Sequence, residues 1–383
     1  MKIALVAGET SGDLLAGLLI DGLKVQWSNL QTFGIGGARM MERGFTAWWP
    51  SDKLAVRGYI EVLRHYREIV GIRKQLKARL LAADRADRPD VFIGVDAPDF
   101  NLDLARGLRE QGIKTIQFVS PSIWAWRGER IHKIKESVDH VLCIFPFEPA
   151  LYAKHGISAS YVGHPLASVI PLEPNRSKAR EALGLEHEDT VVAVLPGSRA
   201  SEIQYIGETF VQTIKLLLHA RPILKVLLPA VPLLRSQIEM QLSKKLSPQQ
   251  LASVQVLQGQ SHLALAACDV SLVASGTATL EAALFKRPMV IAYKMNPLSW
   301  LLMRKKRYQA WVGLPNILCA DFVVPEFLQG AASPQALSRS ILMWLDNPAA
   351  STKVAERFTH LHQELLRDTP YLAAMDVAEV LAR

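Results

Sequence analysis

The chain has 383 residues, of which 49% are hydrophobic and 21% charged, and 44 basic against 36 acidic side chains give a formal net charge of +8. This length suits two domains, and the composition excludes a disordered chain, a coiled coil and a collagen-like fibre. No apolar run reaches the roughly 18 residues of a membrane-spanning helix. Three widely spaced cysteines predict neither a disulfide framework nor a metal site, and the start of the chain lacks a signal-peptide pattern, so a cytoplasmic location is expected.

The first half of the chain alternates short apolar runs with longer amphipathic stretches. Runs rich in Val and Ile predict buried strands at residues 3–7, 91–95, 115–119, 140–144 and 160–162. Helical spacing follows at residues 14–26 and 102–111. This alternation is typical of a doubly wound α/β domain with a parallel sheet.

The second half repeats this rhythm after a proline-rich break. Gly163-His164-Pro165 closes the first series, and Pro171 and Pro174 mark a linker. Further strands are predicted at residues 190–195, 224–228, 253–257, 269–273 and 289–293, with helices at 201–219 and 277–285. After Pro334 only helical patterns remain. The fold class predicted from these patterns is therefore α/β, with two doubly wound domains.

The loops that follow strands of the first half contain polar side chains, and ligands of open parallel sheets bind beyond the carboxyl ends of the strands. In the loop 8–13, Ser11 and Asp13 can bind hydroxyl groups, although a tight turn with Asp13 near a helix start explains the loop equally well. In the loop 95–101, Asp96 or Asp99 can take a proton from an attacking hydroxyl, while the other caps the next helix.

A third loop of the first half, residues 120–127, contains Trp124 and Trp126 at the end of a predicted strand. Aromatic faces suit sugar rings or acyl chains, and Arg127 suits a phosphate. Packing between domains is the alternative role for one of the two tryptophans.

Two loops of the second half have the features of phosphate sites. Residues 195–199 and 275–281 each follow a strand and open a helix with small residues, so that free backbone N–H groups can face an anion. Arg199 can bind a diphosphate, and Glu281 can accept hydrogen bonds from a ribose diol. Ser201 and Gln204 resemble a capping box for the helix that follows Arg199. Two such loops in one domain predict a nucleotide site.

Several chemistries lack their motifs. The chain has no Walker A loop, no complete dinucleotide fingerprint, no nucleophile elbow and no His-Glu-x-x-His zinc motif. It also lacks an Asp-x-Asp motif that would hold a divalent metal on a sugar nucleotide. We therefore expect no metal and no cofactor.

The excess positive charge gathers in two apolar segments, residues 57–79 and 300–307. Either segment can be a solvated basic face, but two of them favour contact with an anionic bilayer. Nucleic acid is not expected as a partner, because no recognised nucleic-acid motif is present. The expected membrane-contacting residues are Arg57, Ile60, Leu63, Arg64, Arg67, Ile69 and Arg73.

Taken in chain order, these motifs resemble the lipid-A-disaccharide synthase family of bacterial glycosyltransferases. The resemblance spans the whole chain and rests on residues 8–13, 34–37, 95–101, 120–127, 163–165, 195–199, 275–281 and 313–316. It implies a GT-B fold in which residues 1–168 bind the acceptor lipid and the membrane, and residues 169–345 bind the UDP-sugar. Residues 346–383 are then expected to be helices that pack back on the N-terminal domain.

The resemblance also implies the reaction and its residues. UDP-2,3-diacylglucosamine would be joined to 2,3-diacylglucosamine 1-phosphate, known as lipid X, in a β-1,6 linkage with release of UDP. Asp99 would be the general base, with Asp96 as the alternative. The donor-binding residues would be Gly197, Ser198, Arg199, Ser275, Gly276, Thr277, Thr279, Glu281 and Asn316. The acceptor-binding residues would be Glu9, Ser11, Gly12, Asp13, Asn101, Ser122 and Trp124.

Two alternatives stay open at this point. Another UDP-sugar enzyme of the GT-B class would share the nucleotide half, for example a lipid-intermediate N-acetylglucosaminyltransferase or a UDP-sugar epimerase. A non-enzymatic adaptor for anionic membranes or RNA would share the basic, apolar character. For the synthase, a location at the cytoplasmic face of the inner membrane is expected, and a homodimer is left open.

Overall fold

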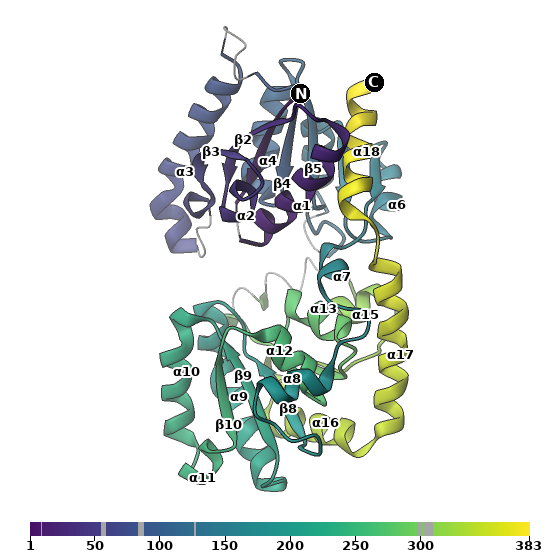
Figure 1. The fold of residues 1–383 in the computed structure, drawn as a ribbon. Helices are drawn as coiled ribbons and strands as arrows, with labels where there is room; N and C mark the ends of the chain where they lie inside the picture. Colours follow the sequence, from purple (N-terminus) through teal and green to yellow (C-terminus); the bar gives the residue numbers. More distant parts are fainter. Residues whose placement is uncertain (9, 55–58, 83–87, 126–127, 298–299, 302–308) are drawn as a thin grey trace. The chain divides into compact units, whose positions relative to one another are not determined.

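The computed structural model describes residues 1–8, 10–54, 59–82, 88–125, 128–297, 300–301 and 309–383, without the side chains of residues 10, 11, 52 and 59–66. The chain divides into two compact units (Figure 1). The first consists of Met1–Ser168 and Leu365–Arg383, and the second consists of Val169–Glu364. The C-terminal helices are thus divided between the two units.

The first unit is built on a parallel sheet with the strand order β3-β2-β1-β4-β5-β6-β7. Its strands are β1 Lys2–Ala7, β2 Gln31–Gly36, β3 Thr46–Pro50, β4 Val91–Val95, β5 Lys114–Phe118, β6 His140–Cys143 and β7 Ala159–Tyr161. Its helices are α1 Thr10–Gln26, α2 Ala38–Met41, η1 Ser51–Lys53, α3 Tyr59–Leu80, α4 Pro98–Arg109, α5 Arg130–Ser137, α6 Glu148–Ala153, α7 Pro165–Val169 at the boundary, and α18 Thr369–Ala382.

Two strands of the first unit, β2 and β3, are absent from the sequence-based prediction. Glycine is rare in strand interiors, yet β2 needs it where β2 lies against β1. A Cβ on Gly34 would stand 2.2 Å from the Leu5 carbonyl oxygen, and the residue has φ +136°. Trp48 of β3 stacks on Phe33 of β2 with ring centroids 4.7 Å apart, which covers the edge of the sheet with aromatic surface.

The second unit has a parallel sheet with the order β10-β9-β8-β11-β12-β13. Its strands are β8 Val191–Leu195, β9 Lys225–Ala230, β10 Val254–Gln258, β11 Val270–Ala274, β12 Met289–Tyr293 and β13 Glu326–Leu328. Its helices are α8 Arg176–Ala182, α9 Ala200–Ala220, α10 Pro232–Lys245, α11 Pro248–Leu251, α12 Ser261–Ala267, α13 Thr277–Leu284, α15 Leu314–Leu318, η2 Gln329–Ala331, α16 Pro334–Asp346 and α17 Pro348–Leu365.

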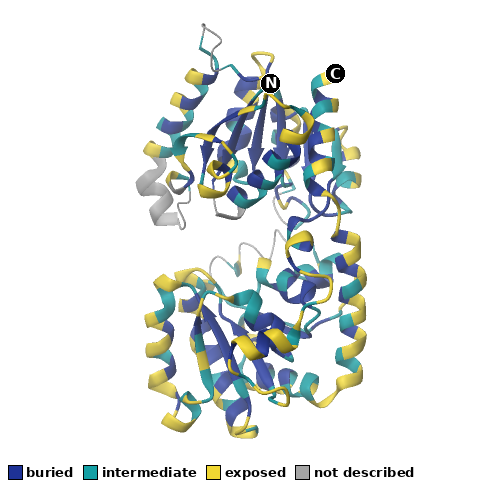
Figure 2. Cartoon of the chain, viewed as in Figure 1, coloured by how far each residue is buried: buried dark blue, intermediate teal, exposed yellow. Residues whose placement is uncertain are grey.

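Both sheets are buried between helices, as the dark strands and exposed outer helix faces in Figure 2 show. The predicted strands are confirmed with small shifts of their bounds. The central strands β4, β8 and β11 are buried on both faces, whereas β7 and β10 are only partly buried. The short β13 was not predicted. No helix in the described part of the chain is both long and apolar enough to cross a membrane.

The C-terminal helix α18 packs on α1 of the first unit. A Cβ on Gly22 of α1 would lie 2.0 Å from the Pro370 carbonyl oxygen, so the close approach of these helices requires glycine. On the sheet side, Asp376 accepts a hydrogen bond from Ser160, whose hydroxyl also lies 2.9 Å from Nε2 of His140. A polar contact and a glycine contact therefore hold the end of the chain on the first unit.

Candidate active site

The second unit has a cavity of about 400 Å³ at the carboxyl ends of β8, β9 and β11. The strand order reverses between β8 and β11, and such switch points are where open α/β sheets bind ligands. The lining residues come from four strand-end loops and the starts of α9, α12 and α13: Leu195, Gly197, Ser198, Arg199, Glu202, Pro229, Ala230, Val231, Gly259, Ser261, Ala274, Ser275, Gly276, Thr277, Ala278 and Glu281. The predicted donor loops are thus brought together in one cavity.

The loop before α9 is held by Glu202. Its Oε2 accepts hydrogen bonds from the backbone N–H groups of Ser198 at 2.8 Å and Arg199 at 3.1 Å. The capping box predicted from Ser201 and Gln204 is therefore wrong, since α9 begins at Ala200 and the Glu202 carboxylate takes the capping role. Gly197 has φ +113°, and a Cβ there would stand 2.3 Å from the same Oε2. Glycine is thus required for the loop to close on Glu202.

The loop before α13 presents small residues to the cavity. A Cβ on Gly276 would have no atom within 4 Å, so this part of the loop borders open space. Ser275 and Thr277 line the cavity as well. Thr279 is fully buried, and its hydroxyl donates to the Gly276 carbonyl oxygen at 2.7 Å, which ties the loop to the first turn of α13.

Glu281 reaches the cavity from α13, and its partner is not among the residues predicted from the sequence. Nε2 of His262, on α12, lies 3.3 Å from Oε2 of Glu281, and the His262 ring packs 5.3 Å from that of Phe285. His262 stands far from Glu281 in sequence, so no local pattern could have indicated the pair.

Asn316 lies outside this cavity and is fully buried. Its Nδ2 donates to the Val324 carbonyl oxygen and to Oε1 of Glu326, both at 2.8 Å, and its Oδ1 accepts from the N–H groups of Val323 and Val324. Glu326 also accepts from the N–H groups of Val312 and Gly313. Asn316 thus joins both ends of one loop, and that loop contacts Ser275 through the Val312 carbonyl oxygen.

In the first unit the strand order reverses between β1 and β4, and the backbone after β4 is strained. Asp96 and Ala97 have φ +52° and +40°, a left-handed conformation that is uncommon for residues other than glycine. The Asp96 carbonyl oxygen accepts from Nδ2 of Asn101 at 2.9 Å and from Nε2 of Gln117 at 3.0 Å. Asn101, predicted to bind acceptor, is fully buried and holds this strained turn.

Asp99 stands on the first turn of α4, and its side chain is 80% exposed. Its Oδ1 accepts a hydrogen bond from Nη2 of Arg130, at the start of α5, at 2.6 Å. Its carbonyl oxygen accepts from Arg73 of α3 at 3.2 Å. An accessible carboxylate with a neighbouring guanidinium is thus available at the carboxyl edge of the sheet.

Asp13 is buried, and its carboxylate binds backbone. It accepts from the N–H groups of Gly37 at 2.8 Å, Arg39 at 2.9 Å and Met40 at 3.2 Å, and so caps α2. A Cβ on Gly37 would lie 2.6 Å from Oδ2 of Asp13, which explains the glycine beside it. Gly12 is buried in α1 near the end of β4, while Glu9 and the side chain of Ser11 lie outside the described residues.

In the loop after β5, Ser122 is exposed and Trp124 is half-buried. Nε1 of Trp124 donates to Oε1 of Glu148 at 2.9 Å. Glu148 is almost completely buried, and burial raises the pKa of its carboxyl group to about 7. Glu148 is not among the residues predicted from the sequence, because a lone acidic residue at a helix start is a common pattern.

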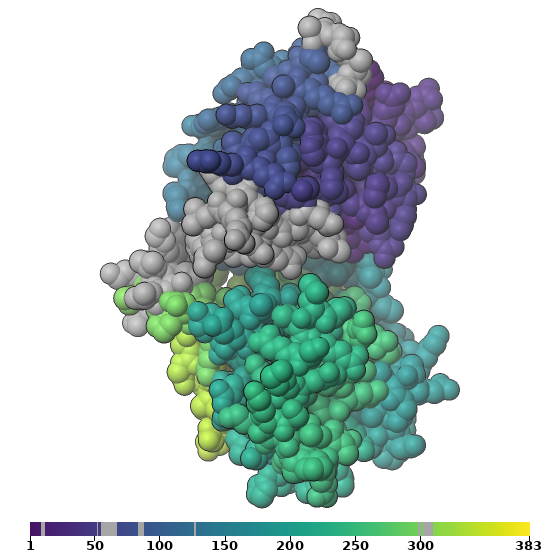
Figure 3. All heavy atoms as spheres, turned by 90° about the vertical axis from the view of Figure 1, so that its left-hand side faces the viewer, coloured from purple at the N-terminus to yellow at the C-terminus, as the bar shows by residue number. Residues whose placement is uncertain are grey.

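Of the residues predicted to contact membrane, Arg67 is exposed and Ile69 is half-buried on α3. Arg73 donates to Oδ2 of Asp103 at 2.7 Å, and so docks α3 on α4. The described part of α3 lies on the face of the first unit that Figure 3 turns to the viewer. Arg57 and the side chains of Ile60, Leu63 and Arg64 lie outside the described residues.

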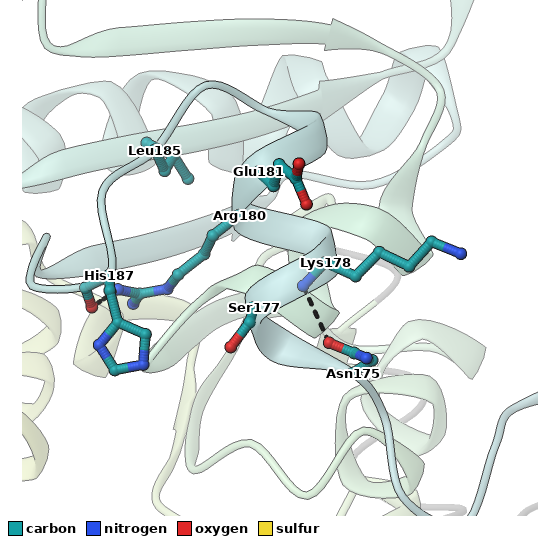
Figure 4. A pocket seen from close by; sticks show the side chains of 7 residues that line it. All are labelled: Asn175, Ser177, Lys178, Arg180, Glu181, Leu185 and His187. Atoms are coloured by element: carbon teal, nitrogen blue, oxygen red, sulfur yellow. Dashed lines mark hydrogen bonds between the residues drawn. The ribbon is translucent and has the colours of Figure 1, made fainter.

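A larger depression of about 630 Å³ surrounds α8, but its arginine is used for structure. Arg180 is 2% exposed and donates to the carbonyl oxygens of Ala267, Glu186, His187 and Asp189 and to Oδ2 of Asp269. Figure 4 shows its side chain extended toward the main chain of His187. With these bonds made, Arg180 anchors α8 to the sheet. Among the described residues no group of three or more His, Cys, Asp or Glu is placed to hold a metal ion.

The two parallel-sheet units, each with a strand order that reverses at a switch point, define a fold of the GT-B class. The fold resembles that of a UDP-GlcNAc 2-epimerase from Neisseria meningitidis bound to UDP-GlcNAc, with a TM-score of 0.65 and 12% identity over all of both chains. It also resembles a glycosyltransferase involved in lipopolysaccharide biosynthesis, with a TM-score of 0.55 and 11% identity over 100% of this chain and 99% of that one. At these identities the likeness concerns the fold alone.

The chain belongs to the lipid-A-disaccharide synthetase family, whose model matches residues 3–377. It is 62% identical to the lipid-A-disaccharide synthase of Albidiferax ferrireducens, over 100% of this chain and 97% of that protein. It is 57% identical to the synthase of Verminephrobacter eiseniae, over 100% of this chain and 98% of that protein. The sequence-based prediction of the family and of the enzyme class is therefore confirmed.

Proposed function

We propose that this chain transfers 2,3-diacylglucosamine from its UDP carrier to lipid X, forming a β-1,6-linked disaccharide 1-phosphate and UDP. Family membership supports the reaction, and the cavity at the switch point of the second sheet is the observation that carries the donor assignment. The cavity combines the amino-terminal ends of α9 and α13 with Arg199, which together favour a diphosphate.

In the proposed donor site, Gly197, Ser198 and Arg199 bind the diphosphate together with Ser275, Gly276 and Thr277. Glu281 accepts hydrogen bonds from the ribose diol, and its approach to His262 at 3.3 Å limits the positions open to its carboxylate. Thr279 and Asn316 are proposed to act indirectly, by holding the loops that line the cavity.

The acceptor site is proposed for the carboxyl edge of the first sheet. Asp99 takes the proton of the acceptor 6-hydroxyl while the hydroxyl oxygen forms a bond to the anomeric carbon of the donor. The bond from that carbon to the diphosphate breaks, and its electron pair leaves with UDP. A β linkage formed from an α-linked donor requires this inversion. Arg199 and the two helix ends stabilise the charge that develops on the diphosphate.

Peripheral association with an anionic membrane is proposed for α3. The exposed Arg67 and half-buried Ile69 on its described part support this assignment, together with the basic, apolar sequence of the helix. Co-sedimentation with vesicles of anionic and of neutral lipid tests it. Binding to anionic vesicles alone is expected, whereas equal recovery in the supernatant with both lipids would contradict it.

Product analysis tests the proposed function. Purified protein is incubated with radiolabelled UDP-2,3-diacylglucosamine and lipid X, with and without EDTA. A tetraacyl disaccharide 1-phosphate is expected in both samples, in amounts equal to the UDP released. Epimerised donor, or UDP release without disaccharide, would contradict the proposal. Loss of turnover in EDTA with recovery on adding magnesium would contradict the part assigned to Arg199.

A further inference from the structure

Three neighbouring strands of the first unit end in one aromatic cluster, defined by Trp124, Phe145, Phe147 and His164. The Trp124 ring stands nearly perpendicular to those of Phe145 and Phe147, with centroids 6.0 and 5.4 Å away. The ring of His164 lies 5.4 Å from that of Phe145. These residues follow β5, β6 and β7, so the cluster stands at the same sheet edge as the strained turn after β4.

Glu148 joins this cluster to the backbone. Its Oε1 accepts from the indole N–H of Trp124 at 2.9 Å, and its Oε2 accepts from the backbone N–H of Phe145 at 3.1 Å. Only 1% of the residue is exposed. A buried carboxylate that receives two N–H donors from different loops holds those loops in a fixed relation.

The loop that contains Trp124 begins in a strained conformation and precedes the helix that starts at Arg130. The loop leaves β5 through Val119, whose φ of +72° is unusual for a β-branched residue. Ser120 then lies 2.7 Å from the hydroxyl of Tyr152 on α6. At its far end, Arg130 starts α5 and donates to Asp99 at 2.6 Å. The strained start of this loop is thus fixed at Ser120 and Trp124, while residues 126 and 127 lie outside the described residues.

We propose that Glu148 is a positioning residue for the acceptor half of the site, which acts by holding Trp124 and the backbone of Phe145 at the carboxyl edge of the first sheet. Nothing assigned above to the transfer reaction uses Glu148. The inference deepens the proposed function and rests on it for its kinetic readout. No covalent step is involved, and the only chemical change at Glu148 is gain or loss of one proton.

The environment of Glu148 makes this role sensitive to pH. Burial raises the pKa of its carboxyl group to about 7, and the titratable groups around it are Cys143 at the end of β6, Tyr152 on α6 and His164 beyond Phe145. Burial also raises the pKa values of Cys143 and Tyr152 and lowers that of His164 to about 4. Near neutral pH, Glu148 is therefore the member of this set that changes charge.

The test compares Glu148→Gln and Trp124→Phe with the wild-type full-length chain. Gln keeps the shape but turns one acceptor oxygen into an N–H donor, and Phe keeps a ring but removes the indole N–H. Each variant is expected to raise the KM for lipid X by about tenfold, with the KM for the UDP-sugar nearly unchanged. The double variant is expected to be no worse than either single one, because both remove the same bond. Glu110→Gln, an exposed acid after α4, is the matched control and should behave like wild type.

A second measurement does not depend on catalysis. The tryptophan fluorescence of the wild-type protein is expected to titrate with a midpoint near pH 7, and this transition should be absent from Glu148→Gln and from Trp124→Phe. If neither the wild-type protein nor any variant transfers sugar, the proposed function is wrong. The fluorescence titration then still tests whether Glu148 holds Trp124. An unchanged lipid X KM and pH profile in Glu148→Gln, or fully additive effects in the double variant, would overturn it. If Glu148→Gln does not fold, Trp124→Phe and its titration decide in the same way.

Discussion

The Asp99 carboxylate accepts a 2.6 Å hydrogen bond from the guanidinium of Arg130, although 80% of the Asp99 side chain remains exposed. The arginine directs one oxygen of the carboxylate and leaves the group open to a ligand. A base for a hydroxyl needs this combination of orientation and access. Asp96, the alternative base, is the residue at which the chain turns through a left-handed conformation.

Replacing Gly197 is expected to disrupt the donor site through Glu202. A Cβ at this position would stand 2.3 Å from Oε2 of Glu202, so Gly197→Ala must displace the carboxylate that holds Ser198 and Arg199. The Kd for UDP, measured by calorimetry, should rise by about tenfold or more. Gly184→Ala is the control, since Gly184 also has a positive φ but no atom within 4 Å of its Cβ position. Equal UDP affinity in the two variants would argue against the role of Glu202.

Replacing Asn316 is expected to lower the stability of the protein rather than to remove a direct contact with the donor. Asn316→Ala removes four hydrogen bonds in the buried loop that ends at Glu326, and should lower the free energy of unfolding by about 2–4 kcal/mol. Asn175→Ala removes one exposed helix cap and should cost about 1 kcal/mol. Urea denaturation measures both. A loss of UDP affinity at unchanged stability would instead indicate direct contact between Asn316 and the donor.

Glu148 accepts from the backbone N–H of Phe145 and His164 packs near its ring, and the two residues should make opposite contributions to stability as the pH changes. Burial holds the pKa of His164 at about 4, below its ordinary 6.5. Between these two pH values the folded protein binds fewer protons at His164 than the unfolded chain does. The stabilising contribution of His164 is therefore lost as the pH falls from 6.5 to 4. Burial raises the pKa of Glu148 from 4.5 to about 7, so its contribution is present below pH 4.5 and is lost as the pH rises through 7.

Single variants should reveal these two slopes, which largely cancel in the wild-type protein. Relative to wild type, His164→Asn should gain roughly 3 kcal/mol on going from pH 7 to pH 4, since one pKa unit corresponds to about 1.4 kcal/mol. Relative to wild type, Glu148→Gln should gain a similar amount of stability on going from pH 4 to pH 7. Denaturation curves at several pH values provide the measurement, and differences from wild type that do not vary with pH would refute this assignment.

The sequence predicts this fold well where strands are continuous apolar runs, and less well where tertiary contacts decide. Strands such as β4 and β8 are buried on both faces, so their continuous apolar sequences identify them. In β2, Gly34 is explained by its approach to β1 and Gly36 by the packing of Met40 and Phe45. The β3 strand combines two tryptophans with a proline. A period-two pattern cannot indicate either strand.

The candidate site shows the same division. Loops after strands could be identified because topology alone brings them to one edge of a sheet. The contact partners of the residues in these loops could not be identified from the sequence, because Arg130 lies 31 residues from Asp99 and Glu148 lies 24 residues from Trp124. For Asp13 the sequence fits ligand binding and a structural turn equally well, and its contacts to the backbone N–H groups of Gly37 and Arg39 show the capping role that it has in the structure.

The role of Asp99 is tested most directly by measuring transfer and UDP affinity on the same preparation of Asp99→Asn. The variant keeps the size of the side chain and removes the proton acceptor, while the donor cavity lies in the other unit and is untouched. Disaccharide formation should fall by about a hundredfold or more, the range typical of a lost general base, with the Kd for UDP unchanged. Transfer at a near-normal rate, or a loss of UDP binding that accounts for the defect, would contradict the assignment of Asp99 as the base.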